Sequence, residues 1–229
     1  MPALDAVSVV DLWERGRALG PISRALMLAA AGSGEREAAV AEWPLGRREA
    51  ALVGLRMACF GETMPVAVAC PACGEGLEFE INAADAKFED DEASLALASG
   101  ARFRAPTTND LMVAAHEKSP VEGARRLIDR CRLDDGAPLG DADVEEVDRR
   151  MAEWRRGAAI ALRLHCAECG HAWSDEFDAA AYLWIEIEAR ARDLLDEVHW
   201  LASRYGWSES EILALSPARR AAYLERCLA

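Results

Sequence analysis

The feature that most constrains the fold of this 229-residue chain is a pair of Cys-x-x-Cys-Gly motifs. The first begins at Cys70 and the second at Cys166, so about ninety residues separate them. Apolar residues alternate with polar ones on both sides of each motif, as in Val66 and Val68 before the first. Alternation of this kind predicts short strands. We therefore expect two hairpins, each carrying one pair of thiols at its tip.

Thiolates from two hairpin tips are typical of a zinc ribbon with one tetrahedral ion. The predicted ligands of a structural Zn²⁺ are Cys70, Cys73, Cys166 and Cys169. The glycine after each second cysteine suits a turn with positive φ. Two alternatives remain open, a pair of disulfides and a redox pair, although disulfides need an oxidising compartment. His165 and His171 adjoin the knuckles, and the sequence does not decide whether either replaces a thiolate.

The formal charge of −14 is unevenly distributed along the chain. Residues 70–100 carry eight acids against Lys87, and the acids include the run Glu89 to Glu92, expected to be a solvated loop. This excess of negative charge repels the phosphate backbone of nucleic acids, so we expect no nucleic-acid partner. No window is long and apolar enough for a membrane span. Residues 1–5 contain no basic n-region before an apolar stretch, so we expect no secretory signal. We expect no membrane association and a location in the bacterial cytoplasm.

The predicted fold class is α+β and mainly α, a helical body with a small antiparallel zinc ribbon. Helices are expected over residues 11–15, 21–31 and 45–60. We expect five segments that form one compact unit: N-terminal helices at 1–62, ribbon halves at 63–82 and 158–178, a mainly helical insert at 83–157, and a long helix with a terminal helical hairpin at 179–229.

The longest predicted element is a helix over residues 179–205, where apolar residues repeat every seven positions. A heptad repeat indicates a seam against one dominant neighbouring helix, either internal or from another chain. After Gly206, a Ser-x-x-Glu capping box opens a short helix. The apolar residues of this region are the candidate partner-binding anchors, namely Trp184, Tyr205, Trp207, Ile212 and Leu213.

The chain shows no sequence signature of catalysis. It has no phosphate-binding loop, no dinucleotide fingerprint, no nucleophile elbow and no His-Glu-x-x-His motif. We therefore expect a non-enzymatic protein without a small-molecule substrate. The alternatives are a nucleic-acid-binding or transcription-associated zinc ribbon, which predicts salt-sensitive binding, and a zinc hydrolase, which predicts an open metal site.

Several stretches resemble the T-even (T-four-type) phage baseplate hub assembly family, which occurs in contractile tails and tail-like injection systems. They include residues 10–16, 45–50, 70–74, 102–107, 180–184, 197–199 and 205–215. The resemblance covers nearly the whole chain. It implies a baseplate hub assembly chaperone or hub subunit whose partners are hub or spike proteins, with possible retention in the particle. It carries over no catalytic residue, and the zinc prediction rests on cysteine spacing alone.

Overall fold

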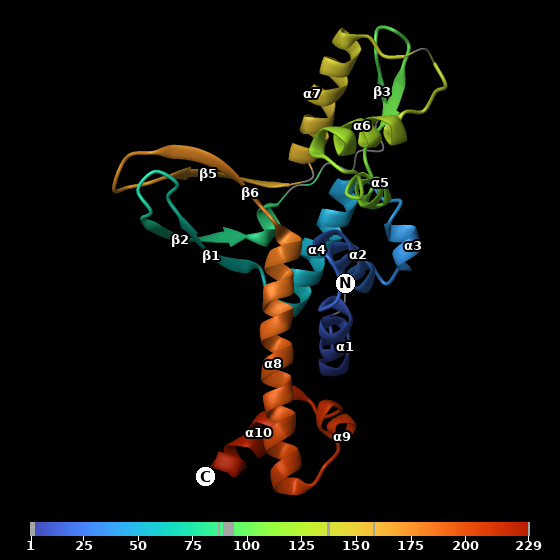
Figure 1. Cartoon of the computed structure of the whole chain (residues 1–229). Helices are drawn as coiled ribbons and strands as arrows, with labels where there is room; N and C mark the ends of the chain where they lie inside the picture. Colours follow the sequence, from blue (N-terminus) through green and yellow to red (C-terminus); the bar gives the residue numbers. More distant parts are fainter. Residues whose placement is uncertain (1–2, 87, 89–93, 137, 158, 229) are drawn as a thin grey trace.

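The computed structural model describes residues 3–86, 88, 94–136, 138–157 and 159–228, so the acidic run at 89–92 lies outside them. In these ranges the chain is mainly helical with small antiparallel two-stranded sheets, which confirms the predicted fold class. Figure 1 shows an elongated arrangement around one long helix, with a head of short elements, a lateral pair of hairpins and a foot of two helices. No helix among the described residues is both long enough and apolar enough to cross a membrane.

The body forms where three N-terminal helices pack on the upper half of helix α8 (Ala179–Tyr205), and a fourth, the third in chain order, packs against the second. These helices are α1 (Ala6–Gly16), α2 (Pro21–Ser33), α3 (Glu37–Val40) and α4 (Leu45–Phe60). Proline at the first position of α2 begins that helix as predicted, but the helix continues past the expected end at residue 31 and through Gly32, and it ends at Gly34, which has the αL conformation. The helix expected at 11–15 is longer in the structure, because Asp5 accepts a hydrogen bond from the Ser8 N–H and caps it earlier. The short α3 was not predicted.

Helix α8 buries its heptad positions against several short helices of its own chain, not against one long neighbour. Leu183, Ile187 and Leu194 are fully buried in the cluster that α1, α2 and α4 complete. Lower down, α9 (Glu209–Leu213) and α10 (Pro217–Leu228) fold back onto the same helix. The internal interpretation of the seam therefore holds, and the expectation of a single dominant partner helix is corrected.

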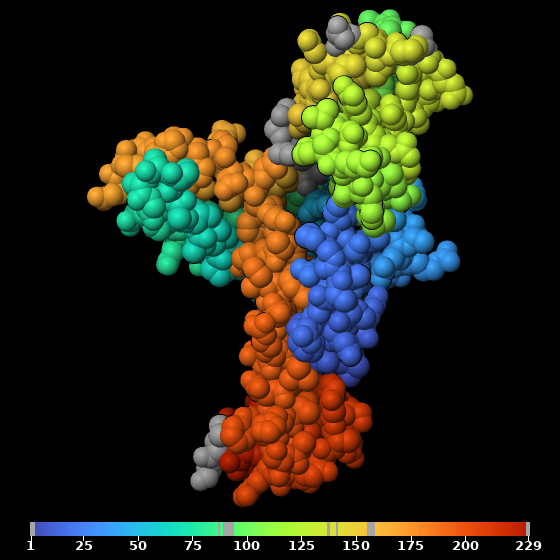
Figure 2. All heavy atoms as spheres, viewed as in Figure 1, coloured from blue at the N-terminus to red at the C-terminus, as the bar shows by residue number. Residues whose placement is uncertain are grey.

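The two hairpins project to one side of the body. Strand β1 (Thr63–Ala69) pairs antiparallel with β2 (Gly76–Asn82), which a 3-10 turn, η1 (Ala83–Asp85), follows. Strand β5 (Ile160–His165) pairs antiparallel with β6 (Ala172–Phe177). We call residues 63–85 and 160–178 the ribbon wing; in Figure 2 it stands apart from the head and the foot.

Between the hairpins the chain builds the head around its own small core. Strands β3 (Ser94–Ala96) and β4 (Arg102–Arg104) pair beside α5 (Thr108–Ala114), α6 (Pro120–Cys131) and α7 (Asp141–Gly157). Phe103, Cys131 and Val147 are fully buried there. The head thus combines three helices with one two-stranded sheet among the described residues, and β3 was not predicted.

The joint between α1, α2 and α8 depends on the absence of a side chain at Gly16. The Trp184 ring lies against this glycine, and the Arg24 guanidinium covers the ring at 4.3 Å from its centroid. Arg24 also donates to the carbonyls of Gly16 and Leu19, at 3.1 and 2.9 Å. A Cβ at position 16 would lie 2.6 Å from Trp184 Cη2 and 3.0 Å from Met27 Cε.

We expect Gly16→Ala to lower the free energy of unfolding by about 1–3 kcal/mol, because a buried indole cannot move aside without repacking. The matched control is Gly76→Ala, whose added Cβ meets no atom within 4 Å, and which should change stability by less than about 0.5 kcal/mol. Urea unfolding followed by circular dichroism measures both. Equal stability of the two variants would contradict this description of the joint.

Candidate functional site

Each cysteine knuckle is a tight turn that closes its hairpin. The Cys70 N–H donates to the Glu75 carbonyl and the Gly74 N–H donates to the Cys70 carbonyl, both at 2.8 Å. The second knuckle repeats this pattern with Cys166 and His171 at 2.8 Å. Gly74 and Gly170 have φ of 80° and 72°, which confirms the predicted positive φ.

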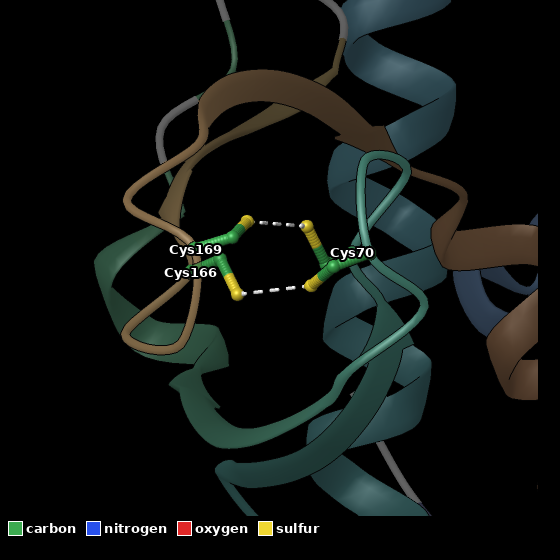
Figure 3. A group of neighbouring side chains, drawn as sticks. Cys70, Cys166 and Cys169 are labelled. Carbon is green, nitrogen blue, oxygen red and sulfur yellow. Dashed lines mark hydrogen bonds between the residues drawn. The ribbon is translucent and has the colours of Figure 1, made fainter.

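The four predicted ligands meet between the hairpins. Their sulfur atoms all lie within 4.8 Å of one another, with Cys70 Sγ at 3.7 Å from Cys169 Sγ and Cys73 Sγ at 3.7 Å from Cys166 Sγ. Figure 3 shows the labelled Cys166 and Cys169 facing Cys70 across the gap. A tetrahedral ion with metal–sulfur bonds of about 2.3 Å places its ligands about 3.8 Å apart. The spacing therefore fits a four-thiolate metal site, and it is too long for disulfide bonds.

The cluster leaves no vacant ligand position, because four sulfurs complete a tetrahedral shell. Cys70 and Cys166 are buried, whereas Cys73 and Cys169 are exposed. His165 and His171 do not belong to the cluster that the described residues form. His171 instead stacks on Trp173, with ring centroids 5.8 Å apart.

The thiols of the cluster do not ionise alike. Burial acts to raise the pKa of Cys70, but hydrogen bonds from the Ala72 and Cys73 main chain and from neighbouring thiols bring it down to about 7. At Cys73, the Glu75 main chain lowers the pKa, yet the thiols of Cys169, Cys70 and Cys166 together with burial raise it to about 12. The hydrogen bonds among the sulfurs thus favour a thiolate at Cys70 and a protonated thiol at Cys73. A bound divalent cation would instead favour the thiolate form of each of its ligands.

A buried ion pair fixes the root of the ribbon wing. The Arg56 guanidinium is 3% exposed and donates to both carboxylate oxygens of Glu186 on α8, at 2.9 and 2.7 Å. Its remaining nitrogen donates to the carbonyls of Gly61 and Thr63, both at 2.7 Å, where β1 begins. Tyr182 on α8 donates to the Pro65 carbonyl at 2.9 Å. Sequence reasoning missed this root, because no motif marks residues that meet from 130 positions apart.

Three of the five candidate partner anchors lie in the interior. Trp184, Ile212 and Leu213 are at most 7% exposed. Their apolar surfaces are already buried by α1, α2, α8 and α9, so the structure corrects their assignment to a partner surface. Tyr205 and Trp207 are half-buried and stack at 4.8 Å between centroids, with Tyr223 against Trp207 at 4.9 Å. Only these two anchors present part of their surface to solvent.

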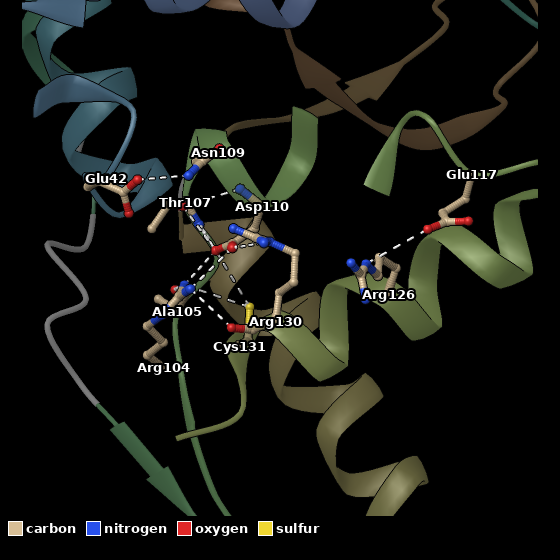
Figure 4. A network of polar contacts seen from close by, with 10 residues as sticks. All are labelled: Glu42, Arg104, Ala105, Thr107, Asn109, Asp110, Glu117, Arg126, Arg130 and Cys131. Carbon is tan, nitrogen blue, oxygen red and sulfur yellow. Dashed lines mark hydrogen bonds and ion pairs between the residues drawn. The ribbon is translucent and has the colours of Figure 1, made fainter. Parts of the chain in front are cut away.

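A buried carboxylate occupies the joint between the head and the body. Asp110 is fully buried and accepts from Arg130 at 2.8 Å and from Arg104 at 3.1 Å (Figure 4). It also accepts from the Thr107 N–H at 3.0 Å and completes the capping box of α5. Burial acts to raise the pKa of Asp110, but the Arg104 guanidinium and the Thr107 hydrogen bonds hold it below its usual value. An ionised, fully paired carboxylate of this kind holds the structure together and has no free oxygen for proton transfer.

Comparison with known proteins identifies a family for most of the chain. A family profile described as "T4 bacteriophage base plate protein" matches residues 35–179, a span that includes all four cysteines of the cluster. No curated protein and no solved structure matches the chain.

We expect Asp110→Asn to lower the free energy of unfolding by about 3 kcal/mol at pH 7, because Arg104 and Arg130 lose their counter-charge. The folded-state pKa of Asp110 is depressed, so its contribution is present above the unfolded value near 3.8 and is lost as the pH falls through the folded pKa. Urea unfolding should therefore show the same difference in the free energy of unfolding between wild type and variant at pH 7 and pH 5. At pH 3 this difference should be smaller.

The matched control is Asp129→Asn on α6, where the carboxylate is exposed. It should change stability by less than about 0.5 kcal/mol at every pH. If Asp110→Asn lowered the free energy of unfolding at pH 7 by no more than Asp129→Asn does, the stabilising role of the Asp110 contacts would be contradicted.

Proposed function

The chain belongs to the T4 bacteriophage base plate protein family, and we propose that it is a non-enzymatic assembly factor of the baseplate hub. In this proposal it acts by protein–protein docking, as an assembly chaperone or as a hub subunit, in a contractile phage tail or a tail-like injection system. The observation that carries the proposal is the family match over residues 35–179. Assembly takes place in the bacterial cytoplasm, and its partners are hub or spike proteins.

We further propose that the thiol cluster holds one structural Zn²⁺. Cys70, Cys73, Cys166 and Cys169 are the ligands, and zinc prefers this all-sulfur tetrahedral set. The ion clips together two hairpins whose cysteines are 93 to 99 positions apart along the chain. Closing so long a loop costs entropy that metal binding offsets. A complete sulfur shell supports a structural role for the ion and not a catalytic one.

Charge and site chemistry support docking to protein in preference to nucleic acid. The ribbon wing carries eight acidic side chains and one basic side chain, Arg163. The acidic residues are Glu75, Glu78, Glu80, Asp85, Glu168, Asp175, Glu176 and Asp178. A zinc ribbon that binds phosphate backbones requires the opposite charge.

We expect the purified, reduced protein to contain one equivalent of zinc. Cys166→Ser should lose the ion and lower the melting temperature by about 10 °C, because a buried ligand is removed and the hairpins separate. Elemental analysis and thermal unfolding measure the two effects. The control, Cys227→Ser, replaces a half-buried thiol of α10 outside the cluster and should retain zinc. The zinc proposal would be wrong if the wild type contained no metal and Cys166→Ser left the melting temperature unchanged.

We expect the affinity-tagged protein to retain a hub or spike protein through purification when it is co-expressed with the tail proteins that its neighbouring genes encode. Mass spectrometry of the eluate identifies the partner, and mass spectrometry of mature particles shows whether this chain remains in them. Presence in the eluate and absence from particles assigns a chaperone, whereas presence in both assigns a subunit. Retention of no tail protein would refute the docking function.

A further inference from the structure

A groove of about 600 Å³ runs along the ribbon wing between β2 and β5. Every residue from Leu77 to Asn82 and from Ala161 to His165 lines it, whereas β1 and β6 contribute none. A strand turns alternate residues to opposite faces, so a groove lined by consecutive residues follows the edges of its strands. We call this feature the edge groove.

The register of the first hairpin shows which main-chain groups face the free edge of β2. The Cys70 N–H donates to the Glu75 carbonyl, so these two residues form a hydrogen-bonded pair. Along an antiparallel ladder such pairs alternate with non-hydrogen-bonded pairs, here called open pairs, whose N–H and C=O groups point away from the partner strand. Glu78 and Glu80, opposite Ala67 and Pro65, are therefore in open pairs. Pro65 has no N–H, and its carbonyl accepts from Tyr182 outside the ladder. Both facts agree with an open pair between Pro65 and Glu80. The N–H and C=O of Glu78 and Glu80 thus point away from β1.

The second hairpin presents the same arrangement on β5. The Cys166 N–H donates to the His171 carbonyl, so Ala161, Arg163 and His165 are in open pairs with β6. Within the described ranges, β2 pairs only with β1 and β5 only with β6. Two strand edges with unpaired donors and acceptors therefore border one groove. An extended segment laid in the groove could satisfy either edge, which is how peptides bind by strand addition.

The side chains around the groove restrict the chemistry of such a segment. Leu77, Phe79 and Ile81 form a half-buried apolar row, while Glu78 and Glu80 are exposed on the opposite face of β2. Residues directly across a strand pair interact, and opposite charges there are favourable. A complementary segment alternates apolar residues with lysine or arginine. The net negative charge of the whole ribbon wing favours the same basic partner at longer range.

We propose that the edge groove binds one extended, basic segment of a partner protein, whose main chain pairs with Glu78 and Glu80 and whose Lys or Arg side chains lie across from their carboxylates. This inference rests on the proposed docking function and specifies the chemistry of its partner. Strand β4, which carries Arg102 and Arg104, is not the occupant, because it pairs with β3 and Arg104 binds Asp110.

The test uses a fluorescein-labelled peptide of about eight residues that alternates valine and lysine, with binding followed by fluorescence anisotropy. Glu80→Pro removes the outward N–H and should weaken binding about tenfold, the loss of one main-chain hydrogen bond together with one charge. Glu80→Gln removes the charge alone and should have a smaller effect. The double variant Glu78→Lys/Glu80→Lys reverses the charge without altering the backbone and should abolish binding. Retained zinc content shows that each variant is folded.

Two controls separate strand addition from simple charge attraction. A peptide of the same sequence with alternate main-chain nitrogens methylated keeps its charge and should not bind. Glu209→Lys/Glu225→Lys reverses two exposed acids in the foot and should leave binding unchanged. Equal binding of the methylated peptide, or no binding of the valine–lysine peptide to the wild type, overturns the proposal.

The same variants separate this inference from the docking function. A hub protein retained equally by the wild type and by Glu78→Lys/Glu80→Lys would remove the edge groove as its site while leaving the docking function intact. Concentration-dependent self-association that this double variant abolishes would assign the groove to a second copy of the chain, and would likewise overturn the proposal.

Discussion

The fold depends on the burial of one stripe of α8. Leu183, Ile187, Leu194 and Leu201 are fully buried along it, and each large apolar side chain removed from water contributes about 1.5–3 kcal/mol. The helices that cover the stripe are short, and α9 has only five residues. Helices of this length are not stable alone in water. They persist because α8 gives each of them an apolar surface to cover, so this helix sets the relative positions of the body and the foot.

The ribbon wing obtains its stability from two attachments and not from a core of its own. A two-stranded hairpin is at best marginally stable in water. At the root, Arg56 is shared between Glu186 and the first residues of β1, and at the tips four sulfurs meet. A metal at the tips would fix the second end of each hairpin. The wing would then be rigid enough to hold the edges of β2 and β5 at a constant separation, which a groove between them requires.

Local features of the sequence predicted the structure well, and distant pairings did not follow from it. The knuckles with the positive φ of Gly74 and Gly170, and the caps at Ser119, Asp178 and Ser208, were predictable, because each depends on neighbours within a few residues. The four thiols were predictable at long range only because metal ligation imposes a recognisable spacing.

The arrangement around α8 lay beyond local reasoning. The heptad repeat of α8 revealed a buried stripe but not that several short helices cover it, since the pattern is the same in both cases. The sequence pattern therefore favours Trp184 as a surface anchor, whereas in the structure Gly16 and Arg24 enclose its ring. The pairing of Asp110 with Arg130 similarly depends on how the head folds, and no spacing in the sequence encodes it.

The distribution of charge gives the ribbon wing a distinct physical role. Residues 3–60 carry seven acidic and seven basic side chains, whereas the wing carries eight acids and Arg163 alone. Free strand edges attract copies of the same edge, and charged side chains along them oppose such pairing. Glu78 and Glu80 stand on an open edge of β2, so two wings repel each other there. The same carboxylates favour a strand of opposite charge, so one set of residues both disfavours self-association and selects a basic partner.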